Sequence, residues 1–145
     1  MLRRRLGLEF VVVNAENAAN GFGITEGTAR ELFDAGADCL TLGNHSWDQR
    51  EALTFIDREP RLLRPLNYPR LSNAPGRGAW LYDAPGGRRV LVVSVLGRVH
   101  MDSLDDAFSG QHPIEVPVRQ VRRGVGHVVE VHVLYVAHRA FVYVP

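Results

Sequence analysis

Two short polar segments of this 145-residue chain carry side chains that could bind metal ions and transfer a proton. Asn14-Ala15-Glu16-Asn17 contains a carboxylate and two amides, and Gly43-Asn44-His45 adds a third amide and an imidazole. Carboxylate and amide oxygens suit divalent cations, and a histidine outside the metal shell can protonate a departing alkoxide. These residue types therefore predict metal-assisted hydrolysis of a phosphoester.

Each polar segment directly follows an apolar run that is typical of a buried parallel strand. We predict strands over residues 9–14 and 38–42, with a helix over residues 26–35 between them that Thr25 caps. A strand, helix and strand of this length require a right-handed crossover, which brings the carboxyl ends of the two strands to one edge of the sheet. The sequence thus predicts an α/β fold in which both polar segments share a crevice.

Taken alone, the same residues also have a purely structural explanation. Asn14 and Asn17 are common turn formers, and Gly43-Asn44 is an ordinary turn dipeptide. His45 could be a structural histidine beside a helix, and Glu16 a solvated loop carboxylate. The residue pattern by itself leaves both interpretations open.

The remaining elements are predicted from periodicity and from turn residues. Residues 47–56 are expected to form a helix, and the proline-rich residues 61–78 an irregular loop. Residues 80–83 and 89–96 are typical of a hairpin, whose second arm should be central in its sheet. The composition changes near residue 110, so we expect a partial domain over residues 1–110 and a divergent, valine-rich tail over residues 111–145, in which residues 128–136 could be a strand.

Four ordered motifs, at residues 14–24, 37–47, 63–69 and 97–101, resemble those of the bacterial calcineurin-like metallophosphoesterases that hydrolyse 2′,3′-cyclic nucleotides. The resemblance implies an α/β sandwich and a dinuclear centre of two divalent metal ions, commonly iron or manganese. It implies that Glu16 is shared between the two ions, that Asn44 and Asn17 are further ligands, and that His45 is the general acid. A hydroxide bridging the metals would be the nucleophile.

The loop with the third motif contains the candidate substrate-binding residues Arg64, Asn67 and Tyr68. Arg64 could bind phosphate oxygens with its planar guanidinium, and Tyr68 could stack on a base. The alternative is that Pro65 and Pro69 shape this loop and that the arginine pairs with a surface carboxylate.

Several motifs of the resembled family are not recognisable in this sequence. These are the opening strand with its aspartate ligand and the later segments that supply three histidine ligands. We therefore expect a partial sandwich without the first strand and the usual C-terminal layer, from a truncated gene model whose tail is read in a wrong frame or replaced by unrelated sequence. His127, His132 and His138 are only weak replacements, so a catalytically inactive fragment that binds metal or nucleotide weakly is the alternative.

Composition limits the other classes of function. Seventeen basic and sixteen acidic residues give a formal charge of +1, which argues against a dedicated nucleic-acid surface. No apolar stretch approaches the roughly 18 residues of a membrane span. The single cysteine excludes an intrachain disulfide and favours a cytoplasmic location. The resemblance implies a small cyclic nucleotide or phosphodiester as partner. An open sheet edge would permit a homo-oligomer.

Overall fold

The structure, a computed structural model, describes residues 2–98, 101, 103–106 and 129–136. Its first sheet is parallel, in the order β1 (Val12–Asn14), β2 (Cys39–Thr41) and β3 (Leu62–Leu63). The second sheet has the order β4 (Ala79–Asp83), β5 (Arg89–Leu96) and β6 (Val129–Val136). The helices are α1 (Leu2–Leu6), α2 (Glu26–Asp34) and α3 (Ala52–Phe55), with the 3₁₀ turns η1 (Arg70–Ser72) and η2 (Pro85–Gly87).

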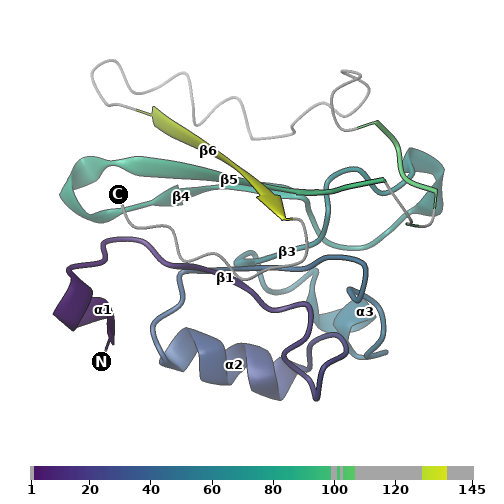
Figure 1. Ribbon diagram of the computed structural model, residues 1–145, viewed down its shortest axis with the longest axis horizontal. Helices are drawn as coiled ribbons and strands as arrows, with labels where there is room; N and C mark the ends of the chain where they lie inside the picture. Colours follow the sequence, from purple (N-terminus) through teal and green to yellow (C-terminus); the bar gives the residue numbers. More distant parts are fainter. Residues whose placement is uncertain (1, 99–100, 102, 107–128, 137–145) are drawn as a thin grey trace.

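The elements form three layers, with α2 and α3 on one side of the first sheet and the second sheet on the other (Figure 1). The alternation of side chains along β2 explains why both faces of the first sheet are apolar. Leu40 packs toward the helices with Ala29 and Phe55, whereas Cys39 packs toward the second sheet with Tyr82 and Val92. The structure therefore confirms the predicted α/β sandwich.

The predicted crossover between the first two strands is confirmed in detail. Thr25 caps α2 with a complete capping box, because its side chain accepts a hydrogen bond from Thr28 N and the Thr28 hydroxyl accepts one from Thr25 N. Gly36, at a φ of 108°, ends the helix in a backbone conformation that favours glycine. β1 and β2 then pair in parallel, with Asn14 opposite Thr41.

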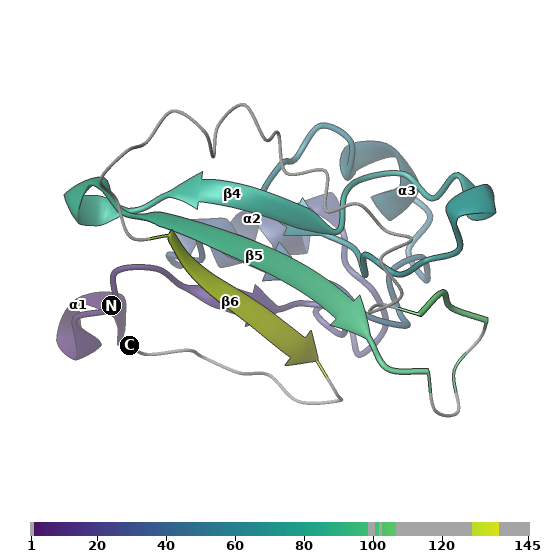
Figure 2. The ribbon, with the colours of Figure 1, turned by 90° about the horizontal axis from the view of Figure 1, so that it is seen from above.

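The second sheet confirms the predicted hairpin and its central arm. β4 and β5 are antiparallel, with Ala79 opposite Val93 and Asp83 opposite Arg89. β6 adds to the free side of β5 in parallel, from Arg89 opposite Val129 to Leu96 opposite Val136. Figure 2 shows β5 between its two neighbours. β6 also confirms the strand expected within residues 128–136, while the proposed division at residue 110 stays a prediction.

The predicted helix over residues 47–56 is wrong in its first half. The chain turns through this part with bonds between residues three apart, such as Asp48 N to His45 O and Ala52 N to Gln49 O, and α3 begins only at Ala52. The Ser46 hydroxyl donates to Gly43 O at 2.6 Å. Short side chains that bind the nearby backbone compete with regular helix formation, which explains the difference.

The expectation of an irregular loop over residues 61–78 is also wrong at its start. Leu62 and Leu63 are fully buried and form β3, in which they pair with Leu40 and Thr41. Only two residues take part, so the strand is too short for a periodic signal and depends on the neighbouring β2 for its existence.

Candidate functional site

The two polar segments meet at the carboxyl edge of the first sheet, as predicted. Ala15 N donates to Thr41 O at 2.8 Å and continues the pairing of β1 with β2 beyond their last residues. The next residue, Glu16, then turns its carboxylate onto the backbone of Gly43. A β-carbon at position 43 would overlap this carboxylate, so the site requires glycine for space.

The Glu16 carboxylate is buried and only half satisfied. Glu16 is 4% exposed, and Asn14 Nδ2 donates a hydrogen bond to Glu16 Oε1 at 3.2 Å. Asn14 Oδ1 also accepts a hydrogen bond from Glu16 N at 3.0 Å. The same asparagine side chain therefore both forms the turn and holds the carboxylate. Glu16 Oε2 has no hydrogen-bond partner among the described residues. A buried, unpaired carboxylate oxygen is costly unless a cation or a donor reaches it.

His45 is held in a defined orientation at the same edge. Its Nδ1 lies 2.7 Å from Asp48 Oδ2, and its ring meets the edge of the Phe22 ring at a centroid distance of 5.4 Å. The imidazole and the carboxylate are both partly exposed. Because Asp48 occupies Nδ1, the other ring nitrogen is the one available for chemistry.

Asn17 and Asn44, the other predicted metal ligands, are both exposed at the ends of the segments that follow β1 and β2. Among the described residues, no three His, Cys, Asp or Glu side chains gather closely enough to hold a metal ion. The unpaired Glu16 oxygen and the amide oxygens of Asn17 and Asn44 are nevertheless of the types that divalent cations prefer, and their role as ligands stays a prediction. The residues present therefore fit a metal ion, with Glu16 as the one anionic ligand.

The three predicted substrate-binding residues lie after β3 in different settings. Asn67 is fully buried, donates to Leu96 O and Asp105 O, and accepts from Leu96 N. Arg64 donates to backbone carbonyls of the same loop rather than to a surface carboxylate. Tyr68 reaches the site edge, where its hydroxyl donates to Gly43 O at 3.3 Å. Their role in substrate binding stays a prediction.

The structure adds Gly43, Asp48 and Asn14 as residues that position the candidate catalytic groups. The His45 to Asp48 spacing of three residues was a visible signal, because side chains three apart meet on a turn of helix. The need for glycine at position 43 had no such signal, since it depends on where the Glu16 side chain lies.

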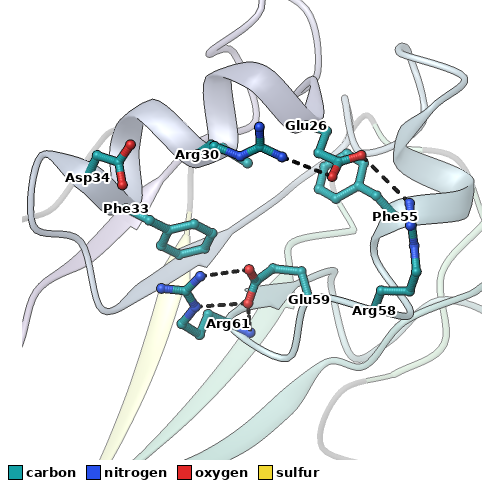
Figure 3. A pocket seen from close by; sticks show the side chains of 9 residues that line it. Glu26, Arg30, Phe33, Asp34, Phe55, Arg58, Glu59 and Arg61 are labelled. Atoms are coloured by element: carbon teal, nitrogen blue, oxygen red, sulfur yellow. Dashed lines mark hydrogen bonds and ion pairs between the residues drawn. The ribbon is translucent and has the colours of Figure 1, made fainter.

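A separate groove of about 260 Å³ lies between α2 and the segment that follows α3 (Figure 3). Its charged side chains pair with one another, Arg30 and Arg58 with Glu26 and Arg61 with Glu59. The Arg61 guanidinium also lies 3.7 Å from the centre of the Phe33 ring. Carboxylates therefore neutralise most of the arginines in this groove. Glu16 Oε2, in contrast, has no partner among the described residues.

The sandwich and its edge site define the class of protein. A Thermus thermophilus protein of known structure aligns with a TM-score of 0.68 at 38% identity, over 94% of this chain and 49% of that one. A phosphatase of known structure from Mycoplasma pneumoniae shows the same fold, with a TM-score of 0.66 at 24% identity over 92% of this chain and 47% of that one. The chain has the metallophosphoesterase fold.

The sequence matches a family model over nearly all of its length. The model is described as YmdB-like protein and matches residues 1–140, so the chain belongs to the YmdB-like family. It is also 40% identical over 107 residues to the 2′,3′-cyclic-nucleotide 2′-phosphodiesterase of Bacillus subtilis. This alignment covers 74% of the chain but 39% of the Bacillus protein. In the part that the structure describes, no helix is long and apolar enough to cross a bilayer.

Proposed function

We propose that this chain carries the catalytic centre of a metal-dependent phosphodiesterase that acts on 2′,3′-cyclic nucleotides. The observation that carries the proposal is the buried Glu16 oxygen, which has no partner among the described residues and lies against Gly43. Keeping an ionised oxygen unpaired in the protein interior is unfavourable, and a bound cation would remove this cost. The similarity to the Bacillus phosphodiesterase supports the substrate class.

In this proposal Glu16 would hold two divalent ions, iron or manganese, together with Asn44 and Asn17 as amide ligands. Bound ions would supply neutralisation of the phosphodiester and an activated water molecule. Asn14 holds Glu16 Oε1, so the free Oε2 keeps one fixed direction. The amides complete a coordination shell without adding negative charge that would repel the substrate.

His45 acts as the general acid. Asp48, 2.7 Å from Nδ1, accepts a hydrogen bond from Nδ1–H and fixes the orientation of the ring. The Nε2 proton then passes to the 2′-oxygen as water adds to phosphorus and the bond between phosphorus and the 2′-oxygen breaks, which leaves a 3′-phosphate. Phe22 packs against the ring and limits its rotation.

Tyr68 is the best placed of the three loop residues to line the substrate pocket. Its hydroxyl binds Gly43 O, and its ring packs against Trp47 at a centroid distance of 5.8 Å. Arg64 and Asn67 hold the loop that carries Tyr68, through the backbone bonds that each makes. A reducing, cytoplasmic setting fits the single cysteine, Cys39, which is a buried free thiol.

A second candidate is a catalytically inactive chain that binds metal or nucleotide weakly. It is favoured by the absence, among the described residues, of three acidic, histidine or cysteine ligands in one cluster. The two candidates differ in turnover and not in fold.

The test is the hydrolysis of 2′,3′-cyclic AMP by the purified protein supplemented with Mn²⁺, followed by chromatography of the products. We expect 3′-AMP, and we expect His45→Ala to reduce turnover by about 10²- to 10⁴-fold. Arg30→Gln, an exposed change in the groove of Figure 3, is the matched control and should keep full activity. Turnover that His45→Ala leaves unchanged contradicts the mechanism, and no turnover in any variant favours the inactive chain.

A further inference from the structure

A second cavity, of about 280 Å³, lies in the loop between β3 and β4, and three arginines line it. These are Arg64, Arg70 and Arg77, and its lining includes no aspartate or glutamate. We call this cavity the arginine pocket. It contrasts with the groove of Figure 3, where arginines and carboxylates neutralise one another.

Arg77 lines the pocket and holds its guanidinium over an aromatic ring. The group lies 4.2 Å from the centre of the Trp80 ring, and the backbone beneath it is held by a bond from Arg64 N to Arg77 O. Within the described part of the chain the Arg77 side chain makes no hydrogen bond or ion pair. Stacking on an aromatic face leaves the N–H edge of a guanidinium open to bind an anion in the ring plane.

Arg64 adds a half-buried positive charge on the same wall. Its guanidinium donates to carbonyls of Pro65, Ala74 and Pro75, and burial lowers the pKa of this group, partly opposed by Tyr68 and Asp57. Carbonyl oxygens satisfy its hydrogen bonds and Asp57 offsets part of its charge, but no carboxylate among the described residues forms an ion pair with it.

The carboxylates that come near this loop bind backbone amides. Asp57 accepts from Gly76 N at 2.7 Å, and Asp105 accepts from Arg70 N at 3.1 Å. The electrostatic character of the pocket therefore depends on Arg64 and Arg77, and an incoming anion would meet a net positive wall.

Tyr68 connects this pocket with the edge of the first sheet. Its ring lines the pocket, with Arg64 at 6.0 Å from the ring centre, while its hydroxyl donates to Gly43 O beside the Glu16 carboxylate. One tyrosine side chain thus separates the positive pocket from the candidate metal ligand. A nucleotide that carries phosphates at both ends of its ribose has one anionic group for each side of this tyrosine.

We propose that the arginine pocket is a second phosphate subsite, which takes the 5′-phosphate of a nucleotide whose 2′,3′-cyclic phosphate lies at Glu16 and His45. The substrate class is then a 2′,3′-cyclic nucleotide with a 5′-phosphate or 5′-phosphodiester, the chemistry found in a free nucleotide and at the 3′ end of an RNA strand. The location of the cyclic end rests on the proposed function, whereas the phosphate subsite rests on the pocket.

The subsite is tested first by binding, without added metal and without turnover. Isothermal titration calorimetry compares AMP with adenosine as probes for the wild type, Arg77→Gln and the control Arg30→Gln, which removes a charge elsewhere. We expect AMP to bind more tightly than adenosine and Arg77→Gln to weaken AMP binding by about 10- to 100-fold, as for the loss of charged hydrogen bonds. Arg77→Lys keeps the positive charge but loses the planar guanidinium, so its affinity for AMP should lie between those of the wild type and Arg77→Gln.

Equal binding of AMP and adenosine, or equal losses in Arg77→Gln and Arg30→Gln, would overturn the subsite. With Mn²⁺ present, kcat/KM should be higher for 2′,3′-cyclic AMP with a 5′-phosphate, or for a dinucleotide ending in a cyclic phosphate, than for 2′,3′-cyclic AMP alone. The better of the two extended substrates identifies the source of the phosphate. Arginine-dependent AMP binding without turnover of any of them supports the phosphate pocket and contradicts the proposed function.

Discussion

Replacing Gly43 by alanine should disturb the candidate site through one defined contact. The new β-carbon would overlap the Glu16 carboxylate, which lies directly against the glycine. Gly43 is not among the glycines with a positive φ, so the backbone itself accepts alanine without strain. Its effect must therefore come from the displacement of Glu16 or from a shift of the two strands.

Inserting one extra methyl group into a well-packed interior costs about 1–3 kcal/mol. We expect Gly43→Ala to lower the free energy of unfolding by this amount, as measured by urea denaturation followed by circular dichroism. Gly27→Ala is the matched control, because a β-carbon there meets only Thr25 Oγ1 at 3.8 Å. Within α2 this change should stabilise the protein by about 0.5–1 kcal/mol.

The double variant with Glu16→Ala shows whether the carboxylate is the cause. Without the longer side chain the overlap disappears, so the cost of Gly43→Ala should fall to nearly zero and give an interaction energy of about 1–3 kcal/mol. An equal cost of Gly43→Ala in both backgrounds would refute the placement of Glu16 against Gly43.

Three further outcomes follow from the described contacts. Asp48→Asn removes the anionic partner of His45 Nδ1 and should lower kcat by about 10- to 100-fold with a smaller change in KM, measured in the phosphodiesterase assay; an unchanged kcat would contradict the pairing. Asn67→Ala removes three hydrogen bonds to backbone groups of Leu96 and Asp105, and it should lower the free energy of unfolding by about 2–3 kcal/mol in urea denaturation. A loss below about 0.5 kcal/mol would show that these hydrogen bonds are not formed. Burial raises the pKa of the Cys39 thiol from 9.0 to about 12, so the unfolded chain loses this proton first, and the contribution of the thiol to stability, full below pH 9, declines as pH rises toward 12. Cys39→Ala should flatten this decline in alkaline urea titrations, and an identical decline would contradict it.

The parts of the fold that the sequence predicts are those with a local cause. Thr25 and Gly36 mark the ends of α2 through capping and a positive φ, and the short β-branched run before Asn14 marks β1. β3 has no such cause, because Leu62 and Leu63 form a strand only where β2 offers a partner. The five-residue helix α1 also lacked a periodic signal.

The same distinction applies to the site. The meeting of Glu16 with the segment of His45 follows from the crossover, so the sequence alone predicts it. The pairing of Asn14 with Glu16, and the absence of a described partner for Glu16 Oε2, depend on side-chain packing and could not be predicted. His132 lies on β6 opposite Val92, and His127 and His138 lie outside the described residues.

In the proposed site, the buried Glu16 oxygen faces a metal ion. Equilibrium dialysis against Mn²⁺, followed by elemental analysis, measures the number of tightly bound ions per chain in the wild type, Glu16→Ala and the control Glu31→Ala, a carboxylate of α2. We predict bound metal that is lost in Glu16→Ala and kept in Glu31→Ala and in His45→Ala. Metal binding that survives Glu16→Ala, or a wild type that binds no metal, would contradict the role of Glu16 as a metal ligand.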